Sequence, residues 1–378
     1  MKKILSLILA LSLCLSLASC GAGKEGENSE GAETGQTSPR EESGSKAPEL
    51  KGYAIVLSEQ PGSYELKRFP MSIQGDNVLI GYTASKEGIF YLVTNYAEAS
   101  DEHTNYDLFR LDPVTGENSH VLNLYEGGSS FFVGKPCIIG RDIYFLAQTE
   151  LDFAIVRYSL DEDKITTIES IDDRDIMFNL ASDDRYLCWV MPEDGAYVLK
   201  SYDSQDDEVR LVSRDISEKI ASASLTVSDG VCTVLEEGTE GSFIVSYDLA
   251  QGQILSSKPV PEGMDIRKLQ GGRQILSFAD GLGKDALTYC STHELEDLSA
   301  LFKSTGSNIA SFSSHIYGSA VVINSQYPPE ILVVYPYDGQ YERIELEQPL
   351  FSAALSCDGI FTAIDNNTGE IICMDLGW

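Results

Sequence analysis

The sequence predicts an all-β fold, a seven-bladed β-propeller of four-stranded antiparallel blades, over residues 51–378. Runs rich in Ile, Val, Tyr and Phe follow one another through this region, and convincing amphipathic helices are missing. The runs recur in pairs with a period of about 44 residues. Because a period of this length built only from strands is typical of a propeller, each repeat is expected to form one blade.

Each pair consists of a strand, a polar loop and a second strand that is followed by a turn residue. These turn residues are Asp112, Asp161, Asp203, Asp248, His293, Asp338 and Asp375. Successive members are 49, 42, 45, 45, 45 and 37 residues apart. An Asp side chain opens a β-turn by accepting hydrogen bonds from backbone N–H groups two residues on. We therefore expect a structural role for this set on one rim of the propeller, with a ring of calcium sites as the alternative.

A tight polar turn precedes the first strand in several pairs. The clearest instances are Ser182-Asp183-Asp184, Ser228-Asp229-Gly230 and Cys357-Asp358-Gly359. Asp-Gly and related turns join adjacent antiparallel strands with the twist that those strands need. A Ser-Asp-Gly turn followed by an apolar strand resembles the turns of TolB-like and WD40-like propellers. The resemblance extends over most of residues 51–378 and implies the same fold.

The two ends of the repeat region are expected to meet in one blade. The chain ends at Trp378, directly after the third strand of the seventh repeat, so this blade lacks its outermost strand. Segments 53–58 and 64–69 both precede the first repeat and could supply it. We expect 64–69 to do so, because it directly precedes the inner strand expected near 77–84. Such pairing would remove the open edge of the ring.

Residues 1–19 are predicted to be a lipoprotein signal peptide. Met1-Lys2-Lys3 is a basic start, and the apolar run from Ile4 to Leu17 is too short to span a bilayer of about 30 Å. Leu17-Ala18-Ser19-Cys20 resembles the lipobox of bacterial lipoproteins, in which the signal is cut before the cysteine and its sulfur is lipidated. The resemblance implies lipid attachment at Cys20 and a position on the extracytoplasmic face of the cell membrane.

Residues 20–50 are predicted to be the lipidated cysteine and a disordered linker. Residues 21–50 contain no aromatic side chain and a single large aliphatic one, Leu50. Such a segment cannot bury enough apolar surface to offset its conformational entropy. The propeller domain is therefore expected to cover residues 51–378.

The charge of the chain bears on its partners. The formal net charge is −32, and removal of Lys2 and Lys3 with the signal peptide makes it −34. Binding nucleic acid requires clustered Lys and Arg, so nucleic acid is not an expected partner. Acidity also keeps an exported domain soluble, and the alternative is attraction of cations or basic partners. We expect a monomer.

Six cysteines remain after Cys14 leaves with the signal peptide and Cys20 is lipidated. They are Cys137, Cys188, Cys232, Cys290, Cys357 and Cys373. They are widely separated, lack CxxC pairing and lie beside apolar residues. We expect reduced, buried side chains rather than disulfides or a metal site.

The loops inside the strand pairs should lie on the face opposite the turn residues, and they are acidic. With one crossing between blades, they form a candidate mouth: Tyr96, Asp101, Glu102, His103, Glu150, Asp152, Asp172, Asp173, Glu193, Asp194, Glu236, Glu237, Asp280, Asp285, Tyr327 and Asp365. Converging carboxylates could bind Ca²⁺, which takes six to eight oxygen ligands. Tyr beside carboxylates could instead bind sugars or a basic peptide. The third alternative is ordinary solvated surface.

Catalytic motifs are weak throughout the sequence. It contains no HExxH, no GxSxG, no P-loop and no GxGxxG followed by a helix. No catalytic residue and no resident cofactor is therefore expected, and Ca²⁺ is the one ion considered. The sequence favours a lipid-anchored, extracytoplasmic binding module for a protein, peptide or glycan. The alternative is a carbohydrate-active enzyme, a glycoside hydrolase or lyase, that uses two carboxylates of the mouth.

Overall fold

The computed structural model describes most of the region predicted to form the propeller. The described residues are 57–73, 77–95, 106–123, 131–148, 153–171, 180–216, 225–238, 241–260, 266–271, 276–280, 285–291, 294–297, 312–317, 320–326, 328–335 and 338–377. Every described residue belongs to the compact unit Leu50–Trp378. The predicted signal peptide, Cys20 and the linker lie outside the described residues. Within the described part, no helix is long and apolar enough to cross a bilayer.

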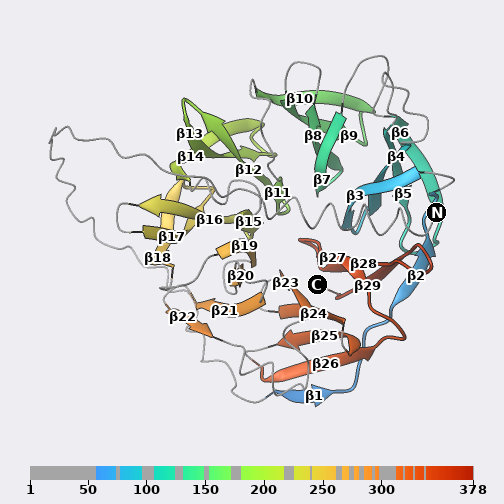
Figure 1. Cartoon of the computed structure of the whole chain (residues 1–378). Coiled ribbons are helices and arrows are strands. Elements are labelled where there is room, and N and C mark those ends of the chain that lie inside the picture. Colours follow the sequence, from blue (N-terminus) through green and yellow to red (C-terminus); the bar gives the residue numbers. More distant parts are fainter. Residues whose placement is uncertain are drawn as a thin grey trace, which may run out of the picture. The chain divides into compact units, whose positions relative to one another are not determined.

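The described residues form 29 strands and no helix, so the all-β prediction is confirmed. Hydrogen bonds join the strands into six sheets that follow one another around a ring (Figure 1). Three sheets use four consecutive antiparallel strands each. They are β3 (Asn77–Ser85), β4 (Gly88–Asn95), β5 (Tyr106–Leu111) and β6 (Asn118–Asn123); β7 (Phe131–Ile139), β8 (Asp142–Gln148), β9 (Phe153–Ser159) and β10 (Lys164–Ile171); and β19 (Ile266–Gly271), β20 (Leu276–Asp280), β21 (Asp285–Ser291) and β22 (Glu294–Asp297).

The prediction of seven separate four-stranded blades is wrong, because two of the predicted repeats share one eight-stranded sheet. This sheet contains β11 (Ala181–Ser182), β12 (Tyr186–Glu193), β13 (Ala196–Asp203), β14 (Glu208–Ile216), β15 (Leu225–Ser228), β16 (Val231–Gly238), β17 (Gly241–Asp248) and β18 (Gln253–Pro259). The backbone of Ile216, at the end of β14, pairs with that of Glu236 in β16. Counted as continuous sheets, the propeller therefore has six blades. The period of the sequence reflects the strand pairs, and it gives no signal for the backbone pairing of Ile216 with Glu236.

The last two sheets combine strands from both ends of the described chain. The five-stranded sheet contains β23 (Phe312–Tyr317), β24 (Ala320–Gln326), β25 (Pro329–Tyr335), β26 (Gln340–Glu345) and, parallel to β26, β1 (Ser58–Gln60). The closing sheet contains β27 (Phe351–Leu355), β28 (Ile360–Asp365), β29 (Glu370–Asp375) and, antiparallel to β29, β2 (Lys67–Pro70). Blue β2 thus lies beside red β29 in Figure 1. The predicted closure by 64–69 is confirmed over Lys67–Phe69. Of the alternative segment 53–58, residues 53–56 lie outside the described residues, and Ser58 begins β1.

The core lies between neighbouring sheets. Residues Ile89 to Val93 of β4 are all buried, and their side chains alternate between two clusters. Ile89 and Tyr91 pack with Ile371 of β29, whereas Phe90 and Leu92 pack with Ile143 of β8. Because successive side chains of a strand point to opposite faces, a strand packed on both sides is apolar throughout. This explains why the strand-like runs of the sequence are nearly continuous in hydrophobic residues.

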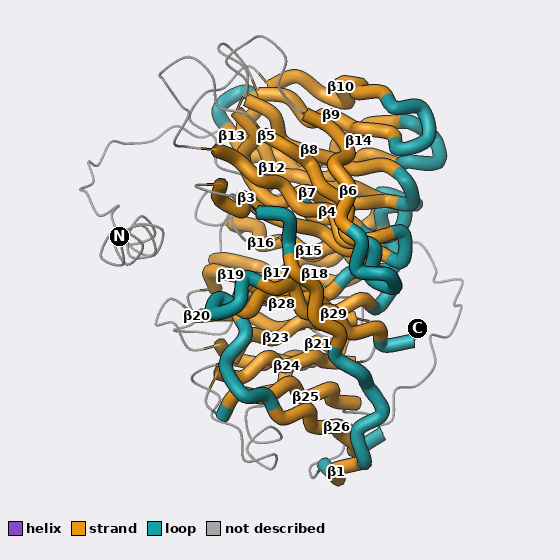
Figure 2. Tube along the Cα trace, turned by 90° about the vertical axis from the view of Figure 1, so that its right-hand side faces the viewer, coloured by secondary structure: helices purple, strands orange, loops and turns teal. Residues whose placement is uncertain are grey.

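The predicted structural role of the turn residues is confirmed at four described positions. Asp112 Oδ1 accepts the backbone N–H groups of Val114 at 2.7 Å and Thr115 at 2.9 Å. Asp203, Asp248 and Asp375 each accept a backbone N–H two or three residues on, at 3.0, 3.0 and 2.8 Å. The turns that follow the third strands lie on one side of the ring, together with the turns between the first two strands of each repeat. Figure 2 shows most of the described loops on that side.

The turn between the first and second strands of a repeat can also contact the next repeat, because its Asp side chain accepts a backbone N–H from there. Asp183 Oδ1 accepts the N–H groups of Arg185 and Tyr186, and its Oδ2 accepts the N–H of Gly230 in the next repeat at 2.7 Å. Asp358 Oδ2 accepts the N–H of Lys86 at 2.5 Å, again in the next repeat around the ring. The polar turns found in the sequence therefore also connect adjacent repeats.

The predicted reduced state is confirmed for five cysteines. Cys137, Cys188, Cys232 and Cys373 are buried and Cys357 is half-buried, and none of these five described thiols forms a disulfide. Burial raises the pKa of Cys357 to about 12, with the nearby Asp358 adding to the shift. The side chain of Cys290 lies outside the described part.

Candidate functional site

Most of the predicted acidic mouth lies outside the described residues. This holds for Tyr96, Asp101, Glu102, His103, Glu150, Asp152, Asp172, Asp173 and Tyr327. For Glu237, Asp280 and Asp285, only the backbone is described. The side chains of the remaining four are described. One of them, Asp194, is exposed in the β12–β13 turn, where its φ of 54° precedes Gly195.

Glu193 belongs to an ion-pair network that connects two sheets. Its Oε2 lies 2.8 Å from Lys200 Nζ and its Oε1 lies 2.9 Å from Arg214 NH2. Lys200 Nζ also lies 2.6 Å from Glu169 Oε1 on β10 of the preceding sheet. Hydrogen bonds from Lys200 and Arg214 hold the pKa of Glu193 below its ordinary value. Glu193 is therefore an ionised structural group.

Glu236 and Asp365 are likewise engaged by neighbours. Glu236 Oε1 accepts hydrogen bonds from Ser213 Oγ at 2.5 Å and from the Tyr247 hydroxyl. Asp365 is fully buried, and its Oδ2 accepts from Arg68 NH1 at 2.9 Å and from the side-chain amide of Gln348. Burial opposes ionisation of Asp365, but the N–H of Asn367 and the Arg68 guanidinium outweigh it and lower the pKa. Both carboxylates thus accept hydrogen bonds from neighbouring side chains of the propeller.

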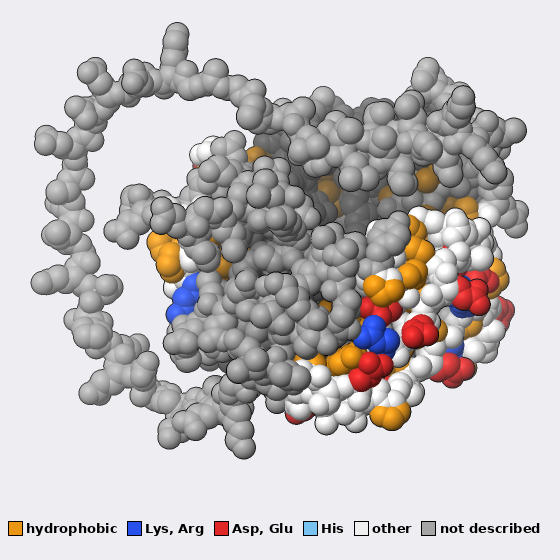
Figure 3. Space-filling model, turned by 60° about the horizontal axis from the view of Figure 1, so that its bottom comes forward, with side chains coloured by type: hydrophobic (Ala, Val, Ile, Leu, Met, Phe, Trp, Pro, Cys, Tyr) orange, Lys and Arg blue, Asp and Glu red, His pale blue; other side chains and the backbone are white. Residues whose placement is uncertain are grey.

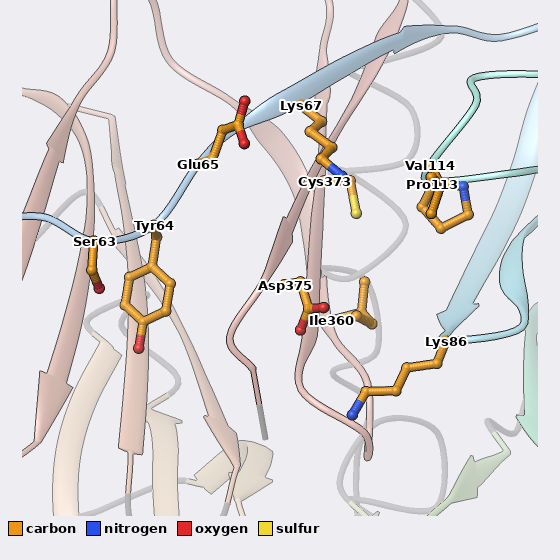
Figure 4. Close-up of a pocket in the computed structure, with 10 residues that line it drawn as sticks. All are labelled: Ser63, Tyr64, Glu65, Lys67, Lys86, Pro113, Val114, Ile360, Cys373 and Asp375. Carbon is orange, nitrogen blue, oxygen red and sulfur yellow. The ribbon is translucent and has the colours of Figure 1, made fainter.

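A pocket of about 470 Å³ lies on the opposite side, between the closing sheet and the β3–β6 sheet (Figure 4). The closing segment (residues 57–73) contributes Ser63, Tyr64, Glu65 and Lys67, and the closing sheet contributes Ile360, Cys373 and Asp375. The turns after β3 and β5 add Lys86, Pro113 and Val114. The walls thus come from segments that are about 300 residues apart in the sequence.

Strand register explains why these side chains face one another. Lys67 pairs with Cys373, and Ile360 pairs with Asp375. Paired residues share one face of a sheet, and Cys373 and Asp375 are two residues apart, so all four lie on the same face. That face packs on the β3–β6 sheet, because Ile360 and Cys373 share an apolar cluster with Ile89 and Leu111. The pocket opens where this packing ends.

The pocket combines both signs of charge with a protonated thiol. Lys67, Lys86, Glu65 and Asp375 are all exposed, whereas Cys373 is buried. Burial raises the pKa of Cys373 to about 11; Asp375 adds to the shift and Lys67 opposes it. Because the thiolate is the nucleophilic form, Cys373 is inert near neutral pH. Among the described residues, no group of three or more His, Cys, Asp or Glu could hold a metal ion.

No pocket residue was among the predicted mouth residues, although Asp375 was predicted as a turn residue, with a calcium site as the alternative. Gly359 directly precedes the second strand of its repeat, where two earlier repeats have Arg141 and Arg185. Gly230 holds the same position in the repeat of Asp248, so a glycine here does not by itself mark the pocket. On the face shown in Figure 3, some described Lys and Arg side chains lie beside Asp and Glu, and others lie apart from them.

Comparison with known proteins shows the fold alone. No protein-family model matches the sequence, and no curated protein is similar to it. The β-propeller domain of the Trilobed protease from Pyrococcus furiosus is 11% identical over 81% of this chain and 95% of that one, with a TM-score of 0.52. BamB from Moraxella catarrhalis is 11% identical over 82% and 96% of the two chains, with a TM-score of 0.41. TolB from Acinetobacter baumannii is 12% identical over 78% and 65%, with a TM-score of 0.36. The chain is a β-propeller with distant structural similarity to these proteins.

Proposed function

We propose that this protein is a non-catalytic binding module, a β-propeller that lipid on Cys20 holds at the extracytoplasmic face of a cell membrane. Its sequence supports the anchor, because a basic start, an apolar run and small residues precede Cys20. Propellers present loops and inter-blade pockets on a rigid frame, which suits binding.

The observation that carries the binding role is the pocket between the closing sheet and the β3–β6 sheet. Its volume of about 470 Å³ lies within the range of roughly 300–1,000 Å³ that is usual for small-molecule sites. Its floor is apolar at Ile360, and charged side chains surround it. A small set of polar groups around an apolar surface is the usual composition of a site that orients a ligand.

The described acids support a role without catalysis. Glu193, Glu236 and Asp365, which belong to the predicted mouth, are held by cationic or hydroxyl-bearing neighbours. Hydrolysis of a glycosidic bond needs one carboxyl group with a raised pKa beside a second carboxylate. The pKa values of Glu193 and Asp365 are instead lowered. These three residues therefore stabilise the propeller through ion pairs and hydrogen bonds.

A ligand screen on the intact protein tests the binding role. The full chain, purified in detergent, is heated with a library of single metabolites, and the midpoint of unfolding is recorded for each. A compound that binds only the folded state raises this midpoint by mass action. Hits are repeated on Lys67→Met, which removes a charge from the pocket, and on Lys164→Met.

Lys164 is the matched control. It is an exposed lysine that opens the outer strand β10, just as Lys67 opens the outer strand β2. We expect at least one compound whose stabilising effect is lost in Lys67→Met and kept in Lys164→Met. A library that yields no Lys67-dependent hit would contradict the proposed function.

A further inference from the structure

We propose that the pocket binds a zwitterion of the size of an amino acid or a dipeptide, with the ligand's ammonium at Asp375 and its carboxylate at Lys67. This inference rests on the proposed function, because it names the ligand class of the same pocket. Three features of the described residues support it: an aspartate without the cationic partner of its equivalent Asp203, a lysine beside it, and an apolar surface between the two sheets.

Asp375 has a structural equivalent that is occupied by a cation. Asp203 pairs with Tyr186, and the preceding residue, Arg185, donates to both Asp203 oxygens at 2.9 and 2.6 Å. Asp375 pairs in the same way with Ile360, and the preceding residue is Gly359. The backbone matches as well, because Arg185 O accepts the N–H of Ser204 and Gly359 O accepts that of Leu376.

Glycine at position 359 therefore removes a guanidinium from a carboxylate that the fold presents in the same way. Asp203 is buried beneath its arginine, whereas Asp375 is exposed to the pocket. Its Oδ1 accepts only the N–H of Gly377 among the hydrogen bonds of the described residues. An ammonium group of a ligand supplies the charge that Arg185 supplies in the other repeat.

The opposite charge comes from the closing segment. Lys67 lies diagonally across from Asp375 in the β2–β29 pair. Diagonal neighbours in a sheet are about 7–8 Å apart, a distance that long side chains can span. In Figure 4 the Lys67 side chain extends toward Cys373, and Lys86 enters from the β3–β6 sheet. No ion pair of Lys67 occurs within the described part of the chain. A ligand carboxylate placed at Lys67, with the ligand's ammonium at Asp375, is therefore attracted by the lysine charge.

An apolar side chain of the ligand has a surface to cover. Ile360 is buried at the base of the pocket, and Val114 at its rim is 78% exposed, the highest value among the large hydrophobic residues described. Burial of apolar area against them adds affinity without adding charge. The combination favours an amino acid or dipeptide with an aliphatic side chain over a sugar or a fully charged ligand.

The dipeptide alanyl-leucine and two blocked forms test the assignment. N-acetyl-alanyl-leucine lacks the ammonium, and alanyl-leucine amide lacks the carboxylate. Calorimetric titration of the full chain in detergent measures the Kd of each. We expect alanyl-leucine to bind and each blocked form to bind at least about tenfold more weakly, because charge-assisted hydrogen bonds are lost.

Two substitutions assign each end of the ligand to a residue. Asp375→Asn should weaken alanyl-leucine by about tenfold and leave the residual binding of the N-acetyl form unchanged. Lys67→Met should weaken alanyl-leucine similarly and leave the amide unchanged. Asp248→Asn and Lys164→Met are the matched controls and should bind like the wild type. Asp248 is a good match because it also closes a third strand and accepts a turn N–H.

Two results would overturn the inference: equal binding of the three compounds, or absence of alanyl-leucine binding up to its solubility limit. Its failure is distinguishable from failure of the proposed function. If the metabolite screen still yields Lys67-dependent hits, the pocket is a binding site for another ligand class. If the metabolite screen also yields no Lys67-dependent hit, both the proposed function and the ligand class are wrong.

Discussion

Arg68 and Asp365 join the two ends of the described chain. Arg68 NH1 on β2 lies 2.9 Å from Asp365 Oδ2 at the end of β28, and the two residues are 297 positions apart. The Asp365 side chain is fully buried, whereas that of Arg68 is 37% exposed. Asp365 also accepts the backbone N–H of Asn367, so one carboxylate holds both the β28–β29 turn and the closing strand. The bond therefore fastens the ring where its strands come from opposite ends of the sequence.

Removal of the Arg68 charge should loosen this closure. We expect Arg68→Met to lower the free energy of unfolding by about 1.5–3 kcal/mol, because it leaves a buried carboxylate with fewer donors. Urea denaturation of the full chain measures the difference. Arg214→Met removes an arginine whose side chain is 54% exposed and should cost less than about 1 kcal/mol. Equal effects of the two substitutions would contradict a special role for Arg68.

The stability that Asp365 provides should depend on pH. Its folded pKa is lowered, so its contribution is fully present above the unfolded value of about 3.9 and is lost as the pH falls through the folded pKa. Asp365→Asn should therefore be less stable than the wild type at pH 6, and the difference should shrink below about pH 4. Thermal unfolding between pH 6 and pH 2.5 measures both proteins. A difference that stays constant over this range would show that the lowered pKa contributes nothing.

Asp183 should be important for the link between two repeats. Its carboxylate accepts three backbone N–H groups, from Arg185 at 2.9 Å, Tyr186 at 2.7 Å and Gly230 at 2.7 Å. Asp183→Ala leaves these donors without their acceptor, and we expect a loss of at least about 2 kcal/mol in the free energy of unfolding. Asp184→Ala is the control, because Asp184 is exposed in the same turn. Chemical denaturation measures the free energy of unfolding of both variants. An equal loss in the two would show that removal of a negative charge, and not loss of the buried hydrogen bonds of Asp183, lowers the stability.

The anchor makes a prediction that does not depend on the propeller. Cys20→Ala removes the sulfur to which the lipobox resemblance assigns the lipid, so the protein should move from the membrane to the soluble fraction. Membrane pelleting followed by mass spectrometry of the N-terminal peptide measures the change. Cys137→Ala, at a buried position, should remain membrane-bound. A Cys20→Ala protein that still pellets would exclude lipidation as the anchor.

The sequence by itself determined the all-β class, the repeat, the role of the turn aspartates and the strand that closes the ring. All of these depend on local chemistry. Runs of β-branched and aromatic residues specify strands, and an Asp that opens a turn accepts N–H groups from the next few residues. The closure at Lys67–Phe69 could be predicted because an edge strand without a partner is unfavourable.

Only the tertiary structure decided the number of continuous sheets, the parallel position of β1 and the site. The Ile216–Glu236 pairing and the Ser58–Gln340 pairing are backbone contacts, which no side-chain pattern encodes. Glu193 and Asp365 looked like members of an acidic mouth, but Lys200 and Arg68 turn them into parts of the frame. The pocket exists because residues 63–67 lie against residues 360–375, and contacts between such distant segments depend on how sheets pack rather than on any local sequence signal.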